Sequence, residues 1–139
     1  YEYKNKMTNK IYNRCKYVVE ENERLLKACN ALKRKDLPTL GELMYQTHEG
    51  LSKDYEVSCD ELDYLVDLTK NDDRIYGARM MGGGFGGCTI NLIDKNEVQD
   101  VCNLFAEKYK RKFGIELKYY ITSINKGTSF IEVYENAKI

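Results

Sequence analysis

The sequence lacks an excess of charge of either sign, because 22 Lys and Arg residues balance 22 Asp and Glu residues among 139. Proteins that bind nucleic acid through a basic surface carry surplus positive charge, so this balance gives no indication of such a partner. The sequence also lacks an apolar run long enough to span a membrane and a leading segment of the signal-peptide type. We therefore expect a soluble protein with neither a nucleic-acid nor a membrane partner.

Histidine occurs once, and the five cysteines are odd in number and widely spaced. Disulfide frameworks and zinc sites use tighter cysteine spacings than those found here, so we expect reduced, buried thiols, a cytoplasmic location and no metal. The single histidine, His48, has no ligand or carboxylate partner nearby in the sequence, which favours a structural role over a catalytic one. The acidic residues between Asp54 and Asp63 could bind a metal, but stabilisation of a helix N-terminus explains most of them. The five cysteines are Cys15, Cys29, Cys59, Cys88 and Cys102.

Proline occurs once, at Pro38, and breaks the pattern between two predicted helices. The second of these begins either at a cap formed by Asp36, with Pro38 in the first turn, or at a capping box of Thr39 and Glu42. A further capping box beginning at Ser58 would start the third helix. Apolar residues at helical spacing predict the first three helices over about residues 8–33, 37–52 and 59–69.

The first predicted helix is long and amphipathic. A fourth helix begins at Asp94 or Asn96 and ends at Gly114, a natural residue for a helix C-terminus. The apolar face of the first helix comprises Ile11, Cys15, Val18, Val19, Asn22, Leu25, Leu26, Cys29 and Leu32.

Runs rich in β-branched and aromatic residues predict four strands. Three helices followed by hairpin-like strands favour an α+β domain, with helices packed on one face of an antiparallel four-stranded sheet. This is a ferredoxin-like arrangement, and we expect residues 1–139 to form one domain. The predicted strands cover residues 75–80, 88–93, 115–121 and 130–134.

Five of the ten glycines lie in one stretch, between two of the predicted strands. It is not a Walker A loop, because Gly87 is followed by Cys88 rather than by Lys and Ser or Thr, and the following strand argues against a dinucleotide-binding turn. Glycine reaches positive φ and admits close approach of another backbone or a ligand. Anion binding and a plain connection between strands remain about equally favoured. The candidate loop residues are Gly82, Gly83, Gly84, Phe85, Gly86 and Gly87.

The stretch Tyr76-Gly-Ala-Arg-Met-Met-Gly-Gly-Gly-Phe-Gly-Gly-Cys-Thr-Ile resembles the third conserved motif of galactokinases, within the GHMP small-molecule kinase superfamily. Met81, Ala78 and Asp60 depart from the usual Thr, Ser and Pro, but none of these departures removes a glycine. Four further segments are similar to the family in order and spacing: Val18 to Arg24, Gly41 to Met44, His48 to Leu51 and Asp54 to Asp63.

This resemblance implies the C-terminal domain of an enzyme that transfers the γ-phosphoryl group of ATP, with Mg²⁺, to the C1 hydroxyl of galactose. In the family, the sugar signature, the phosphate-binding loop and the catalytic Asp lie in an N-terminal domain, and this sequence contains none of them. We therefore expect no catalytic residue here, an inactive chain, and an N-terminal domain as partner. The loop Gly82 to Gly87 would line the cleft, and Arg79 would either position phosphate or make a structural pair.

Two other functions remain open. The chain could belong to a catalytically silent relative that senses galactose and ATP and binds a regulatory partner. It could also be a ferredoxin-like RNA-binding module, although the neutral charge argues against this. Because the chain begins at Tyr1 and not at Met, we expect it to be a piece of a longer protein.

Overall fold

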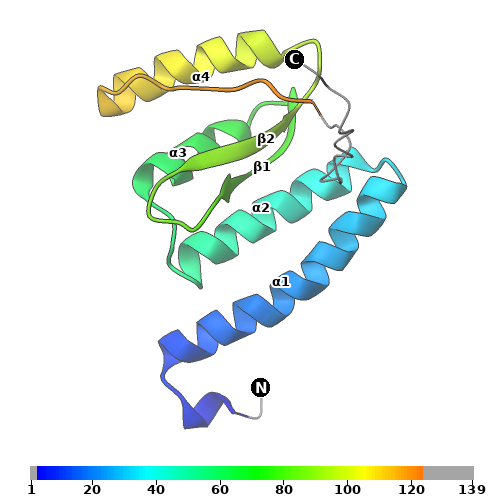
Figure 1. Cartoon of the computed structure of the whole chain (residues 1–139), viewed down its shortest axis with the longest axis vertical. Helices are drawn as coiled ribbons and strands as arrows, with labels where there is room; N and C mark the ends of the chain where they lie inside the picture. Colours follow the sequence, from blue (N-terminus) through cyan, green and yellow to red (C-terminus); the bar gives the residue numbers. More distant parts are fainter. Residues whose placement is uncertain (1–2, 124–139) are drawn as a thin grey trace, which may run out of the picture.

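A computed structural model describes residues 3–123 of the chain. The fold is α+β, and Figure 1 shows a β-hairpin with α4 on one side and α2 and α1 on the other. Within the described range no helix has both the length and the apolar character that crossing a membrane requires. In chain order the elements are a short 3-10 helix Lys4–Lys6, α1 Asn9–Lys33, α2 Leu37–Lys53, α3 Asp60–Thr69, β1 Ile75–Met81, β2 Cys88–Ile93 and α4 Val98–Phe113.

The helix ends follow local chemistry at most positions. Asp36 caps α2, because its Oδ1 accepts a hydrogen bond from the Thr39 backbone N at 3.1 Å. Gly114 ends α4 with φ of 71°, which confirms that prediction. The predicted capping box at Ser58 is wrong, because the Ser58 hydroxyl donates instead to Asp63 Oδ1 at 2.5 Å. A charged acceptor makes the stronger hydrogen bond, so the serine ties a loop to α3 rather than capping it.

The strands β1 and β2 pair antiparallel, with Met80 opposite Thr89 and Gly77 opposite Leu92. Helix α2 packs on β1 at very short range through two glycines. A Cβ on Gly41 would lie 1.7 Å from the Tyr76 carbonyl oxygen, and a Cβ on Gly77 would lie 2.3 Å from the Gly41 Cα. Backbone therefore contacts backbone at this crossing, and any side chain would separate the helix from the strand.

Helices cover both sides of the hairpin, which corrects the prediction that they pack on one face. On one side, Met80 is fully buried in a cluster with Leu62 of α3 and with Val57 of the segment before α3. On the other, Gly77 lies against α2. The glycines allow α2 so close to β1 that the strand is buried from two directions. A second cluster joins α3, β1 and α4 through Leu65, Ile75, Val101, Phe105 and Tyr109.

The structure contains two strands in its described part rather than four, so the predicted strand over residues 115–121 is wrong. This stretch runs alongside α4 and is attached by side chains (Figure 1). Gln99 donates to the Tyr119 hydroxyl at 3.1 Å, and Lys110 pairs with Glu116 at 3.1 Å. Alternating polarity alone does not supply a ladder of backbone hydrogen bonds. The predicted strand over residues 130–134 lies outside the described residues.

The apolar face of α1 does not pack into the core. The side of α1 that faces α2 carries Tyr17 and Ala31, which are buried, and several half-buried polar residues. As a result Cys15 and Cys29 are exposed, as is Cys88, and the remaining two thiols are half-buried. The expectation of buried thiols is therefore wrong, although all five cysteines are free.

Candidate functional site

The glycine loop joins β1 to β2 through a run of left-handed backbone conformations. The φ angles are 102° at Gly82, 90° at Gly84, 129° at Gly86 and 104° at Gly87. Phe85 also has positive φ, at 59°, and its side chain is 79% exposed. Only glycine adopts most of these angles without strain, so the composition of the loop follows from its path.

The loop is held against the segment between α2 and α3. The Phe85 backbone N donates to the Val57 carbonyl oxygen at 2.7 Å. A Cβ on Gly84 would lie 2.5 Å from the same oxygen and 2.7 Å from the Val57 Cβ. By contrast, a Cβ on Gly82, Gly83 or Gly86 would meet nothing within 4 Å. One side of the loop is thus docked on the protein, while the other leaves bare backbone accessible.

A buried histidine supports the strand immediately before the loop. His48 of α2 is 5% exposed, and its Nδ1 accepts a hydrogen bond from the Met80 backbone N at 3.1 Å. Its Nε2 lies 3.1 Å from Asp63 Oδ1 in α3. Because Nδ1 is an acceptor, the proton of the neutral ring is on Nε2 and is donated to Asp63. The ring therefore links α2, α3 and β1.

Asp63 collects hydrogen bonds from several elements. Besides His48, it accepts from Ser58 and, at 2.8 Å, from the Ser52 hydroxyl at the end of α2. Burial by itself would raise the pKa of Asp63, but these hydrogen bonds leave that pKa below its ordinary value. Burial lowers the pKa of His48, and the attraction of Asp63 offsets only part of this effect. The pair is therefore a neutral histidine that donates to a carboxylate.

We expect this pair to make stability depend on pH. The His48 pKa is lower in the folded chain than its ordinary value of 6.5, so below pH 6.5 the unfolded chain binds more protons. The free energy of unfolding should fall as the pH is lowered from 7.5 to 5.5, by at most about 1.4 kcal/mol. The lowered pKa of Asp63 acts in the same direction, but only near and below pH 4. Urea denaturation at constant ionic strength measures the change.

His48 is the single histidine of the chain, so the control is simple. His48→Gln should abolish the step between pH 7.5 and 5.5, and the exposed neighbour Glu49→Ala should retain it. An NMR titration of the ring in the unmodified chain gives a direct second readout. A ring that takes up its proton above pH 6.5 would contradict the assignment.

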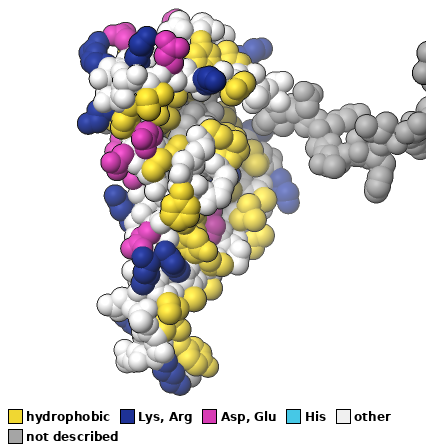
Figure 2. Space-filling view, turned by 60° about the vertical axis from the view of Figure 1, so that its left-hand side comes forward, with side chains coloured by type: hydrophobic (Ala, Val, Ile, Leu, Met, Phe, Trp, Pro, Cys, Tyr) yellow, Lys and Arg dark blue, Asp and Glu magenta, His cyan; other side chains and the backbone are white. Residues whose placement is uncertain are grey.

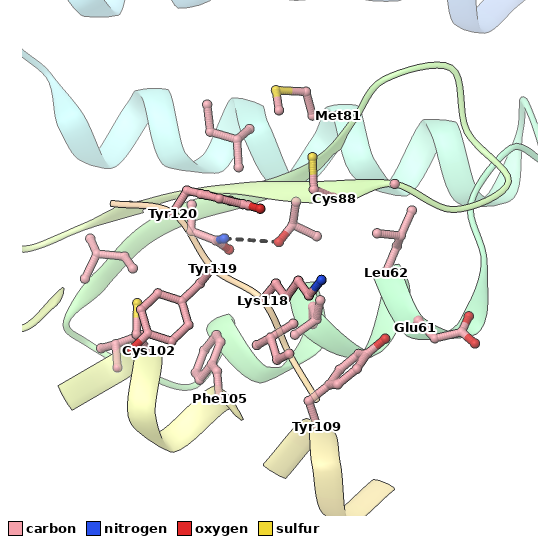
Figure 3. A pocket seen from close by; sticks show the side chains of 18 of the residues that line it. Glu61, Leu62, Met81, Cys88, Cys102, Phe105, Tyr109, Lys118, Tyr119 and Tyr120 are labelled. Carbon is pink, nitrogen blue, oxygen red and sulfur yellow. Dashed lines mark hydrogen bonds between the residues drawn. The ribbon is translucent and has the colours of Figure 1, made fainter. Parts of the chain in front are cut away.

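A cavity of about 750 Å³ lies beside the loop. Phe85, Gly86 and Gly87 line it. Figure 3 shows Tyr109 and Phe105 of α4 on one side of β2, while the Cys88 side chain points to the other side, toward Met81. The cavity is mostly apolar. Glu61 and Lys118 are the charged side chains among its described lining residues.

Arg79 does not lie with the loop. It lines a second cavity, of about 340 Å³, together with Glu21 and Arg24 of α1, and its Nη1 donates to the Met80 carbonyl oxygen at 3.1 Å. The structure thus brings Phe85, Gly86 and Gly87 together at one cavity and places Arg79 at another.

The described residues contain no group of three His, Cys, Asp or Glu side chains that could hold a metal ion. On its open side the backbone of the loop is not covered by other atoms, since a Cβ on Gly82, Gly83 or Gly86 would meet nothing within 4 Å.

Sequence reasoning missed the residues that hold the loop. The acidic residue next to His48 in the sequence, Glu49, is exposed, and the actual partner is Asp63, one helix later. Val57 carries no sequence signal as an anchor for the loop, because the contact uses its backbone carbonyl. The one available signal was the grouping of His48 and Asp63 in motifs that resemble one family.

The described part of the chain is a two-stranded sheet flanked by helices, with a glycine loop docked on Val57. Both its sequence and its fold are similar to those of known proteins. The family model described as "GHMP kinases C terminal" matches residues 16–111. The chain belongs to this family of small-molecule kinase domains.

Within that family the chain is similar to galactokinases. It is 41% identical over 126 residues to a galactokinase of Thermotoga petrophila, covering 91% of this chain and 36% of that protein. It is 43% identical over 115 residues to a galactokinase of Clostridium beijerinckii, covering 83% of this chain and 30% of that protein. The crystal structure of Lactococcus lactis galactokinase complexed with galactose matches with a TM-score of 0.81 and 32% identity, over 86% of this chain and 31% of that one. The chain thus spans about a third of the length of these relatives.

Proposed function

We propose that this chain is the C-terminal domain of a galactokinase, a cytoplasmic enzyme that transfers the γ-phosphoryl group of ATP to the C1 hydroxyl of galactose. The observation that carries the proposal is the glycine loop, which is docked on Val57 and accessible on its other side. The similarity to galactokinases over 91% of the chain supports galactose as the sugar.

In this proposal, residues 1–139 are one domain and the catalytic residues lie in the remainder of the longer polypeptide. ATP, with Mg²⁺, supplies the phosphoryl group when bound. The backbone of Gly82 to Gly87 supports the phosphate-binding part of the enzyme or the reacting sugar, because no side chain keeps either at a distance. His48 and Asp63 position the loop through Met80 and do not touch substrate. Arg79 serves a structural role at the second cavity.

The test is a chimera in which this chain replaces the matched 126 residues of the Thermotoga petrophila relative. We expect the chimera to form galactose 1-phosphate and ADP from galactose and ATP, and the chain alone to form none. Mass spectrometry of the product and a coupled ADP assay measure this, with the parent relative as control. A chimera that binds both ligands without turnover would instead indicate a silent relative that senses galactose and ATP. Phosphorylation of another sugar, but not of galactose, would contradict the proposal.

A further inference from the structure

Helix α1 presents its polar side to the rest of the described molecule. The Tyr17 hydroxyl donates to the Thr47 carbonyl oxygen at 3.5 Å, and Glu21 accepts from the Thr47 hydroxyl at 2.8 Å. The Tyr17 ring also lies over Gly50, where a Cβ would come within 2.4 Å. Small and hydrogen-bonding residues therefore attach α1 to α2.

The apolar side of α1 is left exposed, although hydrophobic residues on a surface helix normally face a core. Val19 is 62% exposed and Leu26 is 66% exposed. Exposed apolar patches of this extent mark interaction surfaces. We call this face the α1 stripe: Ile11, Cys15, Val18, Val19, Leu25, Leu26, Cys29 and Leu32, all of them exposed. Figure 2 shows hydrophobic side chains exposed among charged ones along one side of the molecule.

The α1 stripe continues into the second cavity. Leu25 and Leu32 belong to both, and Ile90 of β2, which is 44% exposed, forms the opposite wall. Leu40, Leu43 and Met44 of α2 also line the cavity. The uncovered apolar surface thus spans α1, α2 and the hairpin. Arg24 and Arg79 supply positive charge at its edge, and Glu21 pairs with Arg24.

The shape of this surface indicates its occupant. Ile11, Val18, Leu25 and Leu32 recur every seven residues, a spacing that also suits pairing with a second copy. Val19 and Leu26, however, widen the stripe beyond the narrow seam of a two-stranded coiled coil. The continuation onto α2 and β2 likewise fits a partner that packs over several elements of one domain.

We propose that the α1 stripe and the second cavity are the surface on which the remainder of a longer polypeptide packs, through an apolar face of its own. The inference rests on the proposed function. The family model is described as C terminal, and the chain covers only 36% of a relative, so most of that relative lies outside the matched part. That remainder has the size to cover a 25-residue helix, which is about 37 Å long.

Thiol labelling followed by peptide mass spectrometry tests the proposal, because Cys29 is an exposed member of the α1 stripe, near its C-terminal end. In the chain alone Cys29 should react at the rate of an exposed thiol. In the chimera it should react at least tenfold more slowly, while the half-buried Cys102 of α4 should react at the same rate in both. Equal Cys29 rates in the chain and the chimera would overturn the inference.

Two variants of adjacent residues on α1 provide a second readout. Leu26→Asp should leave the Tm of the chain alone unchanged, because the side chain is exposed, but lower the Tm of the chimera by at least about 5 °C. Lys27→Asp, about 100° further round the helix and outside the α1 stripe, should change neither. A Leu26→Asp chimera as stable as the parent chimera would contradict the proposal. Light scattering that finds a dimer of the chain, dissociated by Leu26→Asp, with no protection of Cys29 in the chimera would assign the stripe to a second copy instead.

These readouts do not depend on turnover, so the two proposals can fail separately. Protection of Cys29 in a chimera that phosphorylates no galactose would support the docking surface and overturn the proposed function. An active chimera with fully reactive Cys29 would do the reverse.

Discussion

Gly41→Ala should destabilise the chain by about 3 kcal/mol, although glycine to alanine in an exposed helix stabilises by up to about 1 kcal/mol. The sign reverses because the new Cβ would lie 1.7 Å from the Tyr76 carbonyl oxygen and 3.0 Å from the Gly77 backbone N. These are backbone atoms of β1, so they cannot move aside as a side chain could. The helix would have to move away from the strand, which would weaken the packing around Met80 as well.

Gly50→Ala is the matched comparison, because it makes the same change in the same helix. Its Cβ would come within 2.4 Å of the Tyr17 ring, a side chain that can rotate. Urea denaturation of both variants should therefore give a larger loss of the free energy of unfolding for Gly41→Ala. Equal losses, or a gain in stability at Gly41, would mean that α2 does not pack on β1 at the range described here.

Gly84→Ala should release the glycine loop from Val57. Alanine at φ of 90° is strained, and its Cβ would lie 2.5 Å from the Val57 carbonyl oxygen that accepts the hydrogen bond from Phe85. We expect a loss of about 2 kcal/mol in the free energy of unfolding of the chain. In the chimera, turnover of galactose should fall at least tenfold, because the loop no longer holds its position.

Gly83→Ala is the control within the same loop. This residue does not have positive φ, and its Cβ would meet nothing within 4 Å. Stability should change by less than about 0.5 kcal/mol and turnover by less than twofold. If both variants reduce turnover equally, the open side of the loop rather than its docking on Val57 limits activity. If neither does, the role assigned to the loop is wrong.

Much of the site was visible in the sequence as composition, but not as geometry. The glycine run identified the loop, and the flanking strands were placed within one residue of β1 and β2. The contact with Val57 and the link from His48 to Asp63 were not predictable, because they join residues from separate elements through backbone groups or a distant carboxylate. Arg79 is adjacent to the loop in sequence, yet the alternation of strand side chains directs it toward α1.

The sequence by itself determined which segments form helices, where α2 begins and where α4 ends, although it placed the start of α4 at Asp94 or Asn96 rather than at Val98. Periodicity, the Asp36 cap and Gly114 act within one or two turns of chain, so local chemistry is sufficient to specify them. Only the tertiary structure decided which face of α1 is covered and that residues 115–121 attach to α4 instead of forming a strand. It also brought α2 so close to β1 that Gly41 and Gly77 must lack side chains. Such outcomes depend on which distant surfaces meet, and each competing contact differs by only a few kcal/mol, which no local pattern resolves.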